Sequence, residues 1–259
     1  MIPVLHGPFG EDGTVQGLLE MAGVAYVGAS VLGASLTMDK DVAKAVLRDA
    51  GVPVARSVTV RADEPREGMP DRVAAIGYPL FVKPARLGSS VGISRVPDAD
   101  ALDAALDLGF AHDEKLLVEE LVAGREVECG VLGDRELEAS AVGEILIEAE
   151  WYDYEAKYSP GGMELAVPAD LPAHVTEAVR ATACHAARLC EVEGMARVDF
   201  FVRPDGAHVL NEINAIPGFT GTSVYARLFD ASGVPYPALL DRLIELAVAR
   251  HARQRALAH

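Results

Sequence analysis

The stretch LNEINAIPGFT, residues 210–220, places an acidic and an amide side chain two residues apart at the end of an apolar run. Because a strand alternates its faces, Glu212 and Asn214 point to the same side. Residues 197–202 form a second strand-like run, and the turn-forming residues 203–206 lie between the two runs. This pattern predicts an antiparallel hairpin.

Four polar side chains share one face of this hairpin if its loop has an even length: Arg197, Asp199, Glu212 and Asn214. Carboxylate and amide oxygens beside a guanidinium suit Mg²⁺ held together with phosphates, because that ion accepts a few carboxylates and lets substrate oxygens complete its octahedron. The alternative is an ordinary sheet with a solvated polar face. The rest of the sequence has to discriminate between the two.

The composition is that of a globular chain with ample core, since 50% of its 259 residues are hydrophobic and 24% are charged. This length is enough for more than one domain. The net charge of -16 disfavours a nucleic-acid partner or an anionic membrane surface, because both require a basic field. The three cysteines show no CxxC spacing, so neither a disulfide framework nor a zinc site is indicated. Without a membrane-length apolar run or signal peptide, a cytoplasmic protein is expected.

The first 28 residues predict a β-loop-α-β unit. Strands are expected at residues 2–5 and 24–28, and a helix at 14–22 follows a glycine-rich loop at 6–13. A glycine-rich loop after a strand commonly approaches a ligand. Two strands and one helix are too few for a stable doubly wound domain, so we expect that an N-terminal portion is absent from this sequence.

Lys40 lies in the first turn of a predicted helix that Asp39 caps. The expected apolar stripe of this helix consists of Val42, Val46 and Leu47. A cation in the first turn opposes the helix dipole, and the position makes more sense if the lysine reaches an anion. A solvent-exposed lysine is the alternative.

Lys83 ends a predicted strand at residues 78–84, and a glycine- and serine-rich loop follows at 85–92 before the chain returns as a strand. Backbone amides in such a loop, which includes Ser89 and Ser90, can hold phosphate oxygens. The loop differs from a Walker A loop because the lysine precedes the glycines and no helix follows them. A plain glycine-rich hairpin is the alternative.

The second half of the chain predicts a new sheet and a lid. A strand at residues 115–122 leads through a short hinge to a second strand, and we place a domain boundary there. The loop at 148–162 lacks periodicity, and its aromatic and charged content is typical of a lid over a site. Other expected elements are strands at 53–60 and 139–147 and helices at 71–75, 99–108, 171–192 and 234–252. The last helix is expected to bury Leu239, Leu240, Leu243, Ile244 and Ala247, with its basic end from Arg250 in solvent.

Taken together, these motifs resemble the D-alanine:D-alanine ligase family of the ATP-grasp superfamily. The matching segments are, in order, residues 6–7 with 10–13, 38–40, 82–84 with 88–92, 152–158, 197–199, and 211–214 with 217–220. The resemblance spans the whole chain. It implies an ATP-grasp fold of the α/β (α+β) class, in which two α+β subdomains, residues 29–122 and 123–259, sandwich ATP. Residues 1–28 would be the remnant of a Rossmann-like N-terminal substrate domain.

The resemblance implies an enzyme that joins two D-alanines through a D-alanyl phosphate for peptidoglycan synthesis. The carboxylate of the first D-alanine attacks the γ-phosphate of ATP, and the amine of the second then displaces phosphate. Two Mg²⁺ ions, for which Mn²⁺ can substitute, neutralise the transferring phosphoryl group in such a reaction.

The site residues of the family carry over to matching positions of this chain. By resemblance, the metal ligands are Asp199, Glu212 and Asn214, and the phosphate contacts are Lys40, Lys83, Ser90 and, from the lid, Lys157. The adenine-reading hinge is Glu119, Glu120, Leu121 and Val122, and Glu126 accepts from the ribose. Arg197 and the amide of Gly218 match the oxyanion stabilisers. Ser89, Tyr158, His6 and Glu11 match positions at the first D-alanine, and Ser223 with the amide of Val224 matches the grip on the second.

The family normally continues further toward the N-terminus, with a glutamate that orients the first D-alanine together with Ser89 and Tyr158. We therefore expect residues 1–259 alone to bind ATP weakly and to show little ligase turnover, and we expect the full-length protein to be a homodimer. Tyr158 favours a dipeptide product, because relatives that join D-alanine to D-lactate carry different lid residues. The alternatives are a D-alanine:D-lactate or other ATP-grasp carboxylate:amine ligase, and a non-catalytic nucleotide-binding fragment.

Overall fold

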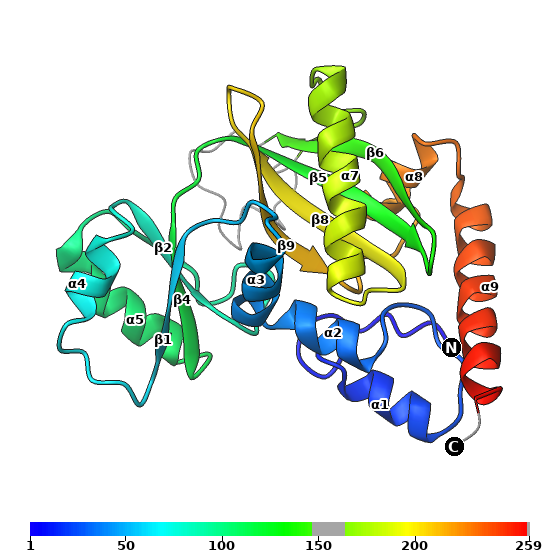
Figure 1. The fold of residues 1–259 in the computed structure, drawn as a ribbon, viewed down its shortest axis with the longest axis horizontal. Helices are drawn as coiled ribbons and strands as arrows, with labels where there is room; N and C mark the ends of the chain where they lie inside the picture. The colour runs from blue at the N-terminus through cyan, green and yellow to red at the C-terminus, as the bar shows by residue number, and fades with distance from the viewer. Residues whose placement is uncertain (147–163, 258–259) are drawn as a thin grey trace.

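The computed structural model describes residues 1–146 and 164–257, which form two antiparallel sheets with helices packed against them (Figure 1). The elements of the first half are α1 (Thr14–Met21), α2 (Val31–Met38), α3 (Lys40–Asp49), β1 (Ser57–Arg61), α4 (Met69–Ala74), β2 (Leu80–Pro84), β3 (Ser94–Val96), α5 (Leu102–Phe110) and β4 (Lys115–Glu120). Those of the second half are β5 (Arg125–Gly133), β6 (Leu137–Leu146), β7 (Glu164–Ala166), α7 (Ala173–Leu189), β8 (Gly194–Val202), β9 (His208–Asn214), α8 (Val224–Asp230) and α9 (Tyr236–Arg255).

The first sheet has the strand order β1-β4-β2-β3, and all its neighbours are antiparallel. One face packs on α4 and α5 through a buried apolar cluster that includes Leu80, Val82 and Val118. Phe81 pairs with Glu119, and Lys83 is two residues beyond Phe81, so all three side chains lie on the opposite face. The alternation therefore separates an apolar face from a face that carries charged side chains.

The second sheet has the order β7-β6-β5-β8-β9. Helix α7 covers one face through Val175, Val179 and Ala183, with the apolar side chains of β5 and β8 beneath it (Figure 1). Helix α8 lies close to the other face, where a Cβ on Gly130 would stand 2.7 Å from the Phe229 ring and a Cβ on Gly143 would stand 2.7 Å from Leu228. Glycine at these two positions allows the close approach of α8 to the sheet.

The N-terminal region departs from the sequence-based expectation. The strands predicted at 2–5 and 24–28 are wrong, because neither segment forms a strand. Two hydrogen bonds still connect this part of the chain: the Met1 ammonium donates to Ala25 O at 2.5 Å, and Val27 N donates to Met1 O at 3.0 Å. Helix α2 was not predicted; it begins after Ser30, whose Oγ accepts from Gly33 N at 3.2 Å. The helix expected at 14–22 is present as α1.

The burial predicted for one residue each in α3 and α9 is wrong, and so is the solvent exposure predicted for Arg250. Val42 is 42% exposed, and the buried face of α3 instead carries Lys40, Ala43, Lys44 and Leu47. Ile244 is 44% exposed. Arg250, expected in solvent, is only 5% exposed and donates to Gly28 O at 2.6 Å and to Tyr26 O at 2.9 Å.

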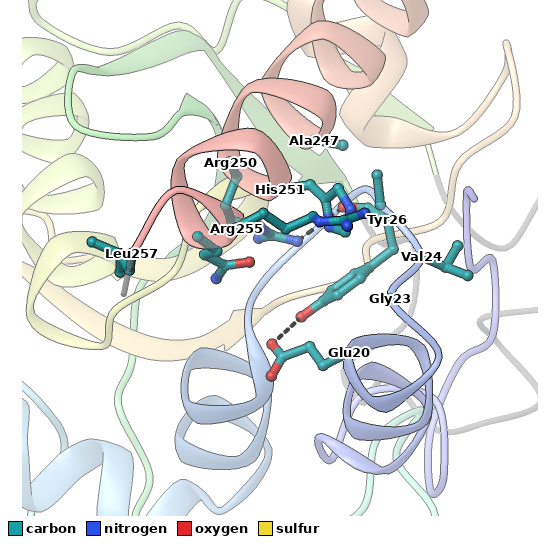
Figure 2. A pocket seen from close by; sticks show the side chains of 11 residues that line it. Glu20, Gly23, Val24, Tyr26, Ala247, Arg250, His251, Arg255 and Leu257 are labelled. Atoms are coloured by element: carbon teal, nitrogen blue, oxygen red, sulfur yellow. Dashed lines mark hydrogen bonds between the residues drawn. The ribbon is translucent and has the colours of Figure 1, made fainter. Parts of the chain in front are cut away.

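Arg250 forms one wall of a cavity of about 570 Å³ between the segment at 23–26 and the end of α9 (Figure 2). Its guanidinium lies 4.5 Å from the centre of the Tyr26 ring, and the Tyr26 hydroxyl donates to Glu20 at 2.7 Å. The last helix is thereby fixed to the first segment of the chain.

Among the described residues, the helices are too short or too polar to cross a membrane. The division of the chain at residues 28 and 122 stays a prediction.

Candidate active site

In the hairpin of β8 and β9, Arg197 pairs with Asn214 and Asp199 pairs with Glu212, so the four predicted side chains share one face. The even loop length assumed for this is wrong, because the loop at 203–207 has five residues. A bulge between Asp199 and Phe200 shifts the register by one residue and restores the shared face. The Arg197 guanidinium donates twice to the Asp199 carboxylate at 2.8 Å, and the Asn214 amide donates to the same carboxylate at 2.9 Å. The polar face expected from alternation is therefore formed.

A cavity of about 610 Å³ opens between the two sheets. The predicted residues that line it are Lys40, Lys83, Ser89, Ser90, Glu119, Glu120, Leu121, Val122, Glu126, Asp199 and Glu212. They come from α3, from the glycine-rich loop and from strands of both sheets. The segments that the sequence analysis assigned to phosphate, base, ribose and metal thus converge on one space.

Part of the cavity wall is apolar. Phe81 and Ile93 contribute from the first sheet and its loop, and Phe201, Val209 and Leu210 contribute from the second sheet. A flat aromatic ring can be buried between such side chains, while a few polar groups at its edge fix its orientation. This end of the cavity suits the base of a nucleotide.

Lys40 reaches into the cavity from the first turn of α3. Its Nζ donates to Leu87 O at 2.6 Å and lies 3.4 Å from the Glu212 carboxylate. Asp39 caps the helix as predicted, accepting from Val42 N at 3.2 Å. Lys40 N also donates to Ala85 O at 3.0 Å, so the helix start and the glycine-rich loop are connected.

Glu119 is buried between two lysines. Its carboxylate forms ion pairs with Lys44 on one side and with Lys83 on the other, and Lys83 also lies 3.4 Å from Asn211 Oδ1. Burial lowers the pKa of Lys44 to about 8 against the attraction of Glu119. Burial also opposes ionisation of Glu119, but Lys44 and then Lys83 hold the pKa of Glu119 below its ordinary value.

The glycine-rich loop adopts a conformation that non-glycine residues rarely take. Ser89 and Ser90 have φ values of 53° and 59°, in the left-handed region. Gly92 has a φ of 70°, and a Cβ there would stand 2.8 Å from the His112 ring. Such backbone strain persists only where the surroundings fix it, and it is concentrated at functional sites.

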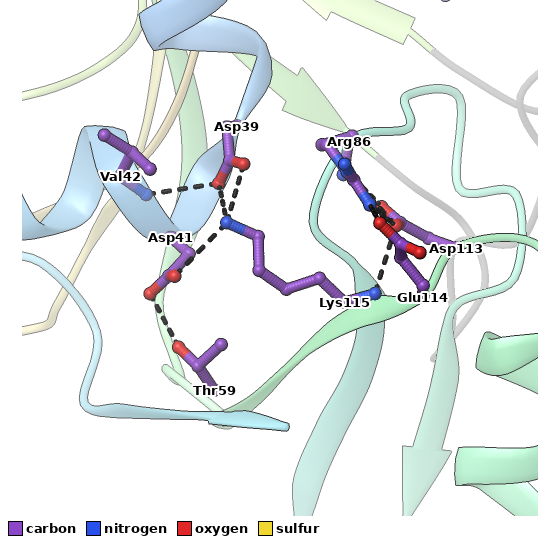
Figure 3. A network of polar contacts seen from close by, with 8 residues as sticks. All are labelled: Asp39, Asp41, Val42, Thr59, Arg86, Asp113, Glu114 and Lys115. Atoms are coloured by element: carbon purple, nitrogen blue, oxygen red, sulfur yellow. Dashed lines mark hydrogen bonds and ion pairs between the residues drawn. The ribbon is translucent and has the colours of Figure 1, made fainter. Parts of the chain in front are cut away.

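The start of this loop is fixed by Asp113. Its carboxylate accepts from Arg86 N at 2.9 Å and from the Arg86 guanidinium at 2.5 Å (Figure 3). Burial opposes the charge, but the hydrogen bonds from Arg86 outweigh it and lower the pKa of Asp113. The loop therefore begins at a rigid attachment point.

Glu11 lies at a smaller cavity of about 30 Å³ that is also lined by Lys40, Gly88, Glu212 and Asn214. The Glu11 carboxylate accepts from Gly7 N at 2.7 Å, and burial raises its pKa. His6 Nδ1 lies 3.0 Å from Ile216 O. The predicted first-substrate residues of the N-terminal segment thus adjoin the polar face of the hairpin.

Gly218 lies in the segment between β9 and α8, Ser223 is the N-cap of α8, and Val224 is its first residue. None of the three is among the residues that line the large cavity. Ser223 Oγ accepts from Thr220 N at 3.0 Å, and a Cβ on Gly218 would stand 3.3 Å from that oxygen. Lys157 and Tyr158, predicted for the lid, lie outside the described residues.

Asp199 and Glu212 are directly opposed on neighbouring strands, with Asn214 next on the same face. Opposed side chains on antiparallel strands stand close enough to share an ion. Among the described residues, no group of three or more His, Cys, Asp and Glu side chains forms a metal site. Two carboxylates and one amide oxygen therefore fit Mg²⁺ only if ligand oxygens complete its shell, as expected for an ion carried with phosphates.

Sequence reasoning missed several residues of the site. Lys44 could have been found because it follows Lys40 by four residues and so lies on the same helix face. Glu128 follows Glu126 by two residues in β5, lines the cavity and lies 3.2 Å from Arg197. Asn211 also lines the cavity, and nothing in the strand pattern distinguished it.

Comparisons with known proteins agree with this arrangement. The family described as D-ala D-ala ligase C-terminus matches residues 46–245, and the one described as D-ala D-ala ligase N-terminus matches residues 1–29. The D-alanine–D-alanine ligase of Mycolicibacterium gilvum is 50% identical over 258 residues, which is 96% of this chain and 70% of that protein.

Solved structures show the same similarity. The VanG D-Ala:D-Ser ligase from Enterococcus faecalis has a TM-score of 0.88 at 41% identity, over 95% of this chain and 72% of that one. The D-alanine–D-alanine ligase of Bacillus anthracis complexed with ATP has a TM-score of 0.82 at 30% identity, over 96% of this chain and 79% of that one. The expected ATP-grasp fold is confirmed, and this chain belongs to the D-alanine–D-alanine ligase family.

Proposed function

We propose that this chain catalyses the ATP-dependent joining of two D-alanines to D-Ala-D-Ala, through a D-alanyl phosphate, for peptidoglycan synthesis in the cytoplasm. The observation that carries the proposal is the opposed pair Asp199 and Glu212, on the wall of a cavity that also holds Lys40 and Lys83. The family membership and the ATP-bound structure of a 30% identical relative support it.

The polar end of the cavity would hold the triphosphate. Lys40 and Lys83 would contact its oxygens, and the amides of the glycine-rich loop, with Ser89 and Ser90, would cover them. Asp199, Glu212 and Asn214 would hold Mg²⁺, which supplies positive charge to the transferring phosphoryl group when bound.

The apolar end would hold adenine. Backbone groups of residues 120–122 would meet the base edge, and Glu126 would accept from the ribose hydroxyls. Because the side chain of Glu119 is occupied by Lys44 and Lys83, its contribution to the hinge would come from its position in the strand. Base and triphosphate would thus span the cavity from one sheet to the other.

The acyl transfer would take place beside the hairpin. Arg197, fixed by Asp199 and Glu128, would donate to the developing oxyanion together with the amide of Gly218. Burial opposes the charge of Arg197, but the Asp199 and Glu128 carboxylates outweigh it, raise the pKa of Arg197 well above its ordinary value and keep it cationic. His6 and Glu11 would lie at the first D-alanine, and Ser223 with the Val224 amide would grip the carboxylate of the second.

A second candidate is a ligase with another acceptor. The 41% identical VanG structure is that of a D-Ala:D-Ser ligase, and its TM-score of 0.88 shows that the same scaffold serves a different second substrate. Product analysis by mass spectrometry, with D-alanine, D-serine and D-lactate in competition across pH, separates these reactions. We expect D-Ala-D-Ala to predominate. A predominant D-Ala-D-Ser or D-Ala-D-lactate product would contradict D-alanine as the second substrate.

ADP release coupled to D-alanine tests the ligase itself. We expect Mg·ATP to bind and ADP to form only when D-alanine is present. Nucleotide binding without D-alanine-dependent ADP formation would select a non-catalytic binding module.

A homodimer is also proposed. Helix α1 presents Leu18 at 65% and Met21 at 91% exposure, and apolar side chains in this position favour association. Analytical ultracentrifugation over a range of concentrations measures the oligomeric state, and a monomer at all concentrations contradicts the proposal.

A further inference from the structure

Two lysines share one buried carboxylate at the back of the nucleotide cavity. Lys44 of α3 and Lys83 of β2 both form ion pairs with Glu119 of β4. The exposed side-chain fractions are 2% for Lys44, 5% for Glu119 and 9% for Lys83. Lys83 and Glu119 line the cavity, whereas Lys44 lies behind them on the buried face of α3. One lysine therefore has access to a ligand, and the other has access only to Glu119.

This arrangement follows from helix and strand periodicity. Lys44 is one turn beyond Lys40 on α3, so both lysines lie on the helix face turned toward the sheets. Phe81 pairs with Glu119, and Lys83 is two residues further along β2, so Lys83 and Glu119 are diagonal neighbours on one face.

We propose that Lys44 is a positioning residue, which keeps Glu119 charged and in place when Lys83 moves from Glu119 to the phosphates of a bound nucleotide. The proposal rests on the phosphate role of Lys83 put forward above. A buried carboxylate that loses its only cation is strongly disfavoured. With Lys44 present, Glu119 keeps one partner, and Lys83 can leave without this penalty.

The electrostatics of the cluster agree with the proposal. Burial lowers the pKa of Lys44, and repulsion from Lys83 and Lys40 lowers it further. The attraction of Glu119 is the main effect that raises it. Lys44 thus stays protonated mainly because Glu119 is ionised. Glu119 in turn depends on Lys44 first and on Lys83 second for its charged form.

The affinity for Mg·ADP, measured by isothermal titration calorimetry at pH 7, tests the proposal on the full chain. We expect Lys44→Met to raise the Kd at least about tenfold, because Lys83 is then the one cation that pairs with Glu119 among the described residues and is withheld from the phosphates. Lys44→Arg keeps the charge and should stay within about threefold. Lys44→Met combined with Glu119→Gln should bind more tightly than Lys44→Met alone, because Lys83 is released.

Lys115→Met is the matched control. Lys115 is equally buried and pairs with Asp39 and Asp41, but it is not among the cavity-lining residues (Figure 3). This variant should lower the Tm and leave the Kd for Mg·ADP within about threefold. The control distinguishes a loss of affinity caused by reduced stability from a loss of affinity caused by the pairing of Lys83 with Glu119.

Three outcomes overturn the proposal: an unchanged Kd in Lys44→Met, a Kd in the double variant as high as that of Lys44→Met, or an equal loss of affinity in Lys115→Met. If Lys44→Met does not fold, the double variant, which removes the charges of Lys44 and Glu119 together, decides alone. Its Kd should lie within about tenfold of the unchanged chain, and lost binding overturns the proposal. If the unchanged chain does not bind Mg·ADP, the proposed function fails instead.

Discussion

Helix α3 meets β4 through two buried ionic clusters of opposite composition. At the start of β4, one cation, Lys115, lies between two carboxylates, Asp39 at 2.6 Å and Asp41 at 3.3 Å (Figure 3). At the end of β4, one carboxylate, Glu119, lies between two cations, Lys44 and Lys83. Both clusters combine lysine with carboxylate side chains, near opposite ends of one strand.

Their surroundings differ as well. In the first cluster, Thr59 donates to Asp41 at 2.6 Å and Val42 N donates to Asp39 at 3.2 Å. Hydrogen-bond donors of the protein therefore stabilise the surplus negative charge. In the second cluster, Lys83 lines the large cavity and carries the surplus positive charge there. The difference favours a structural role for the first cluster and supports the proposed ligand-binding role of the second.

The largest effect is expected on the cavity side, from Glu212→Gln. Glu212 lies 3.4 Å from Lys40 and opposite Asp199, so its loss weakens both the proposed metal site and the position of that lysine. We expect D-alanine-dependent ADP formation to fall by about 10²–10³-fold while the far-UV circular dichroism is unchanged. Glu20→Gln, which removes an exposed carboxylate that accepts from Tyr26, is the control (Figure 2). Retained activity in Glu212→Gln would count against the metal assignment.

Lys115→Met breaks the cluster that is satisfied locally. It leaves Asp39 and Asp41 without their shared cation, and we expect the free energy of unfolding to fall by about 2–3 kcal/mol. The effect is below that of a fully buried pair because the Asp41 side chain is 31% exposed. Urea unfolding monitored by circular dichroism measures the change. A stability equal to that of the unchanged chain would show that the network contributes specificity of packing without net stability.

Lys83→Met tests the opposite balance. Lys44 still neutralises Glu119 in this variant, so we expect a loss of stability of only about 1 kcal/mol. The Kd for Mg·ADP should rise about tenfold or more, because a charge-assisted phosphate contact is removed. Urea unfolding and calorimetry on the same preparation give both numbers. A large loss of stability with unchanged affinity would reverse the distinction between the two clusters.

The smallest effect concerns pH, at the attachment point of the glycine-rich loop. The pKa of Asp113 is lowered in the folded protein, with Arg86 as its main favourable partner. The resulting stability is fully present above the unfolded pKa, about 3.9, and is lost as the pH falls through the lower folded pKa. Arg86 is 43% exposed, so the contribution is small.

Arg86→Gln should therefore lower the Tm slightly at neutral pH, and the difference from the unchanged chain should shrink as the pH falls below about 4. Thermal melting between pH 3 and 7 measures this, with substitution of the exposed Arg203 in the β8–β9 turn as the control. A difference that grows on acidification would contradict the assigned sign.

The features that local periodicity determines could be predicted from the sequence. Alternation placed Arg197 with Asp199 on one face of their strand, and Glu212 with Asn214 on one face of theirs. The two pairs share a face because of the bulge after Asp199, which the sequence pattern did not predict. The cap at Asp39 was equally accessible, because a helix start is a local signal. The roles of these residues come from the resemblance to a family, and they stay predictions.

Features that depend on distant partners could not be predicted. The segments at 2–5 and 24–28 have strand-like composition, but a strand exists only when a neighbour completes its hydrogen bonds. Arg250 was not expected inside, because charged side chains are rarely buried unless a partner is present. Its partners, the carbonyls of Tyr26 and Gly28, are far away in the sequence.

The buried Arg250 has a consequence for the order of events during synthesis. Its hydrogen bond to Gly28 O joins groups that are 222 residues apart, so the segment that carries His6 and Glu11 gains this attachment only after α9 has been translated. At an elongation rate of about 5–20 residues per second, that delay is on the order of 10–45 s. Throughout this interval, the segment at 1–28 lacks the attachment that Arg250 provides.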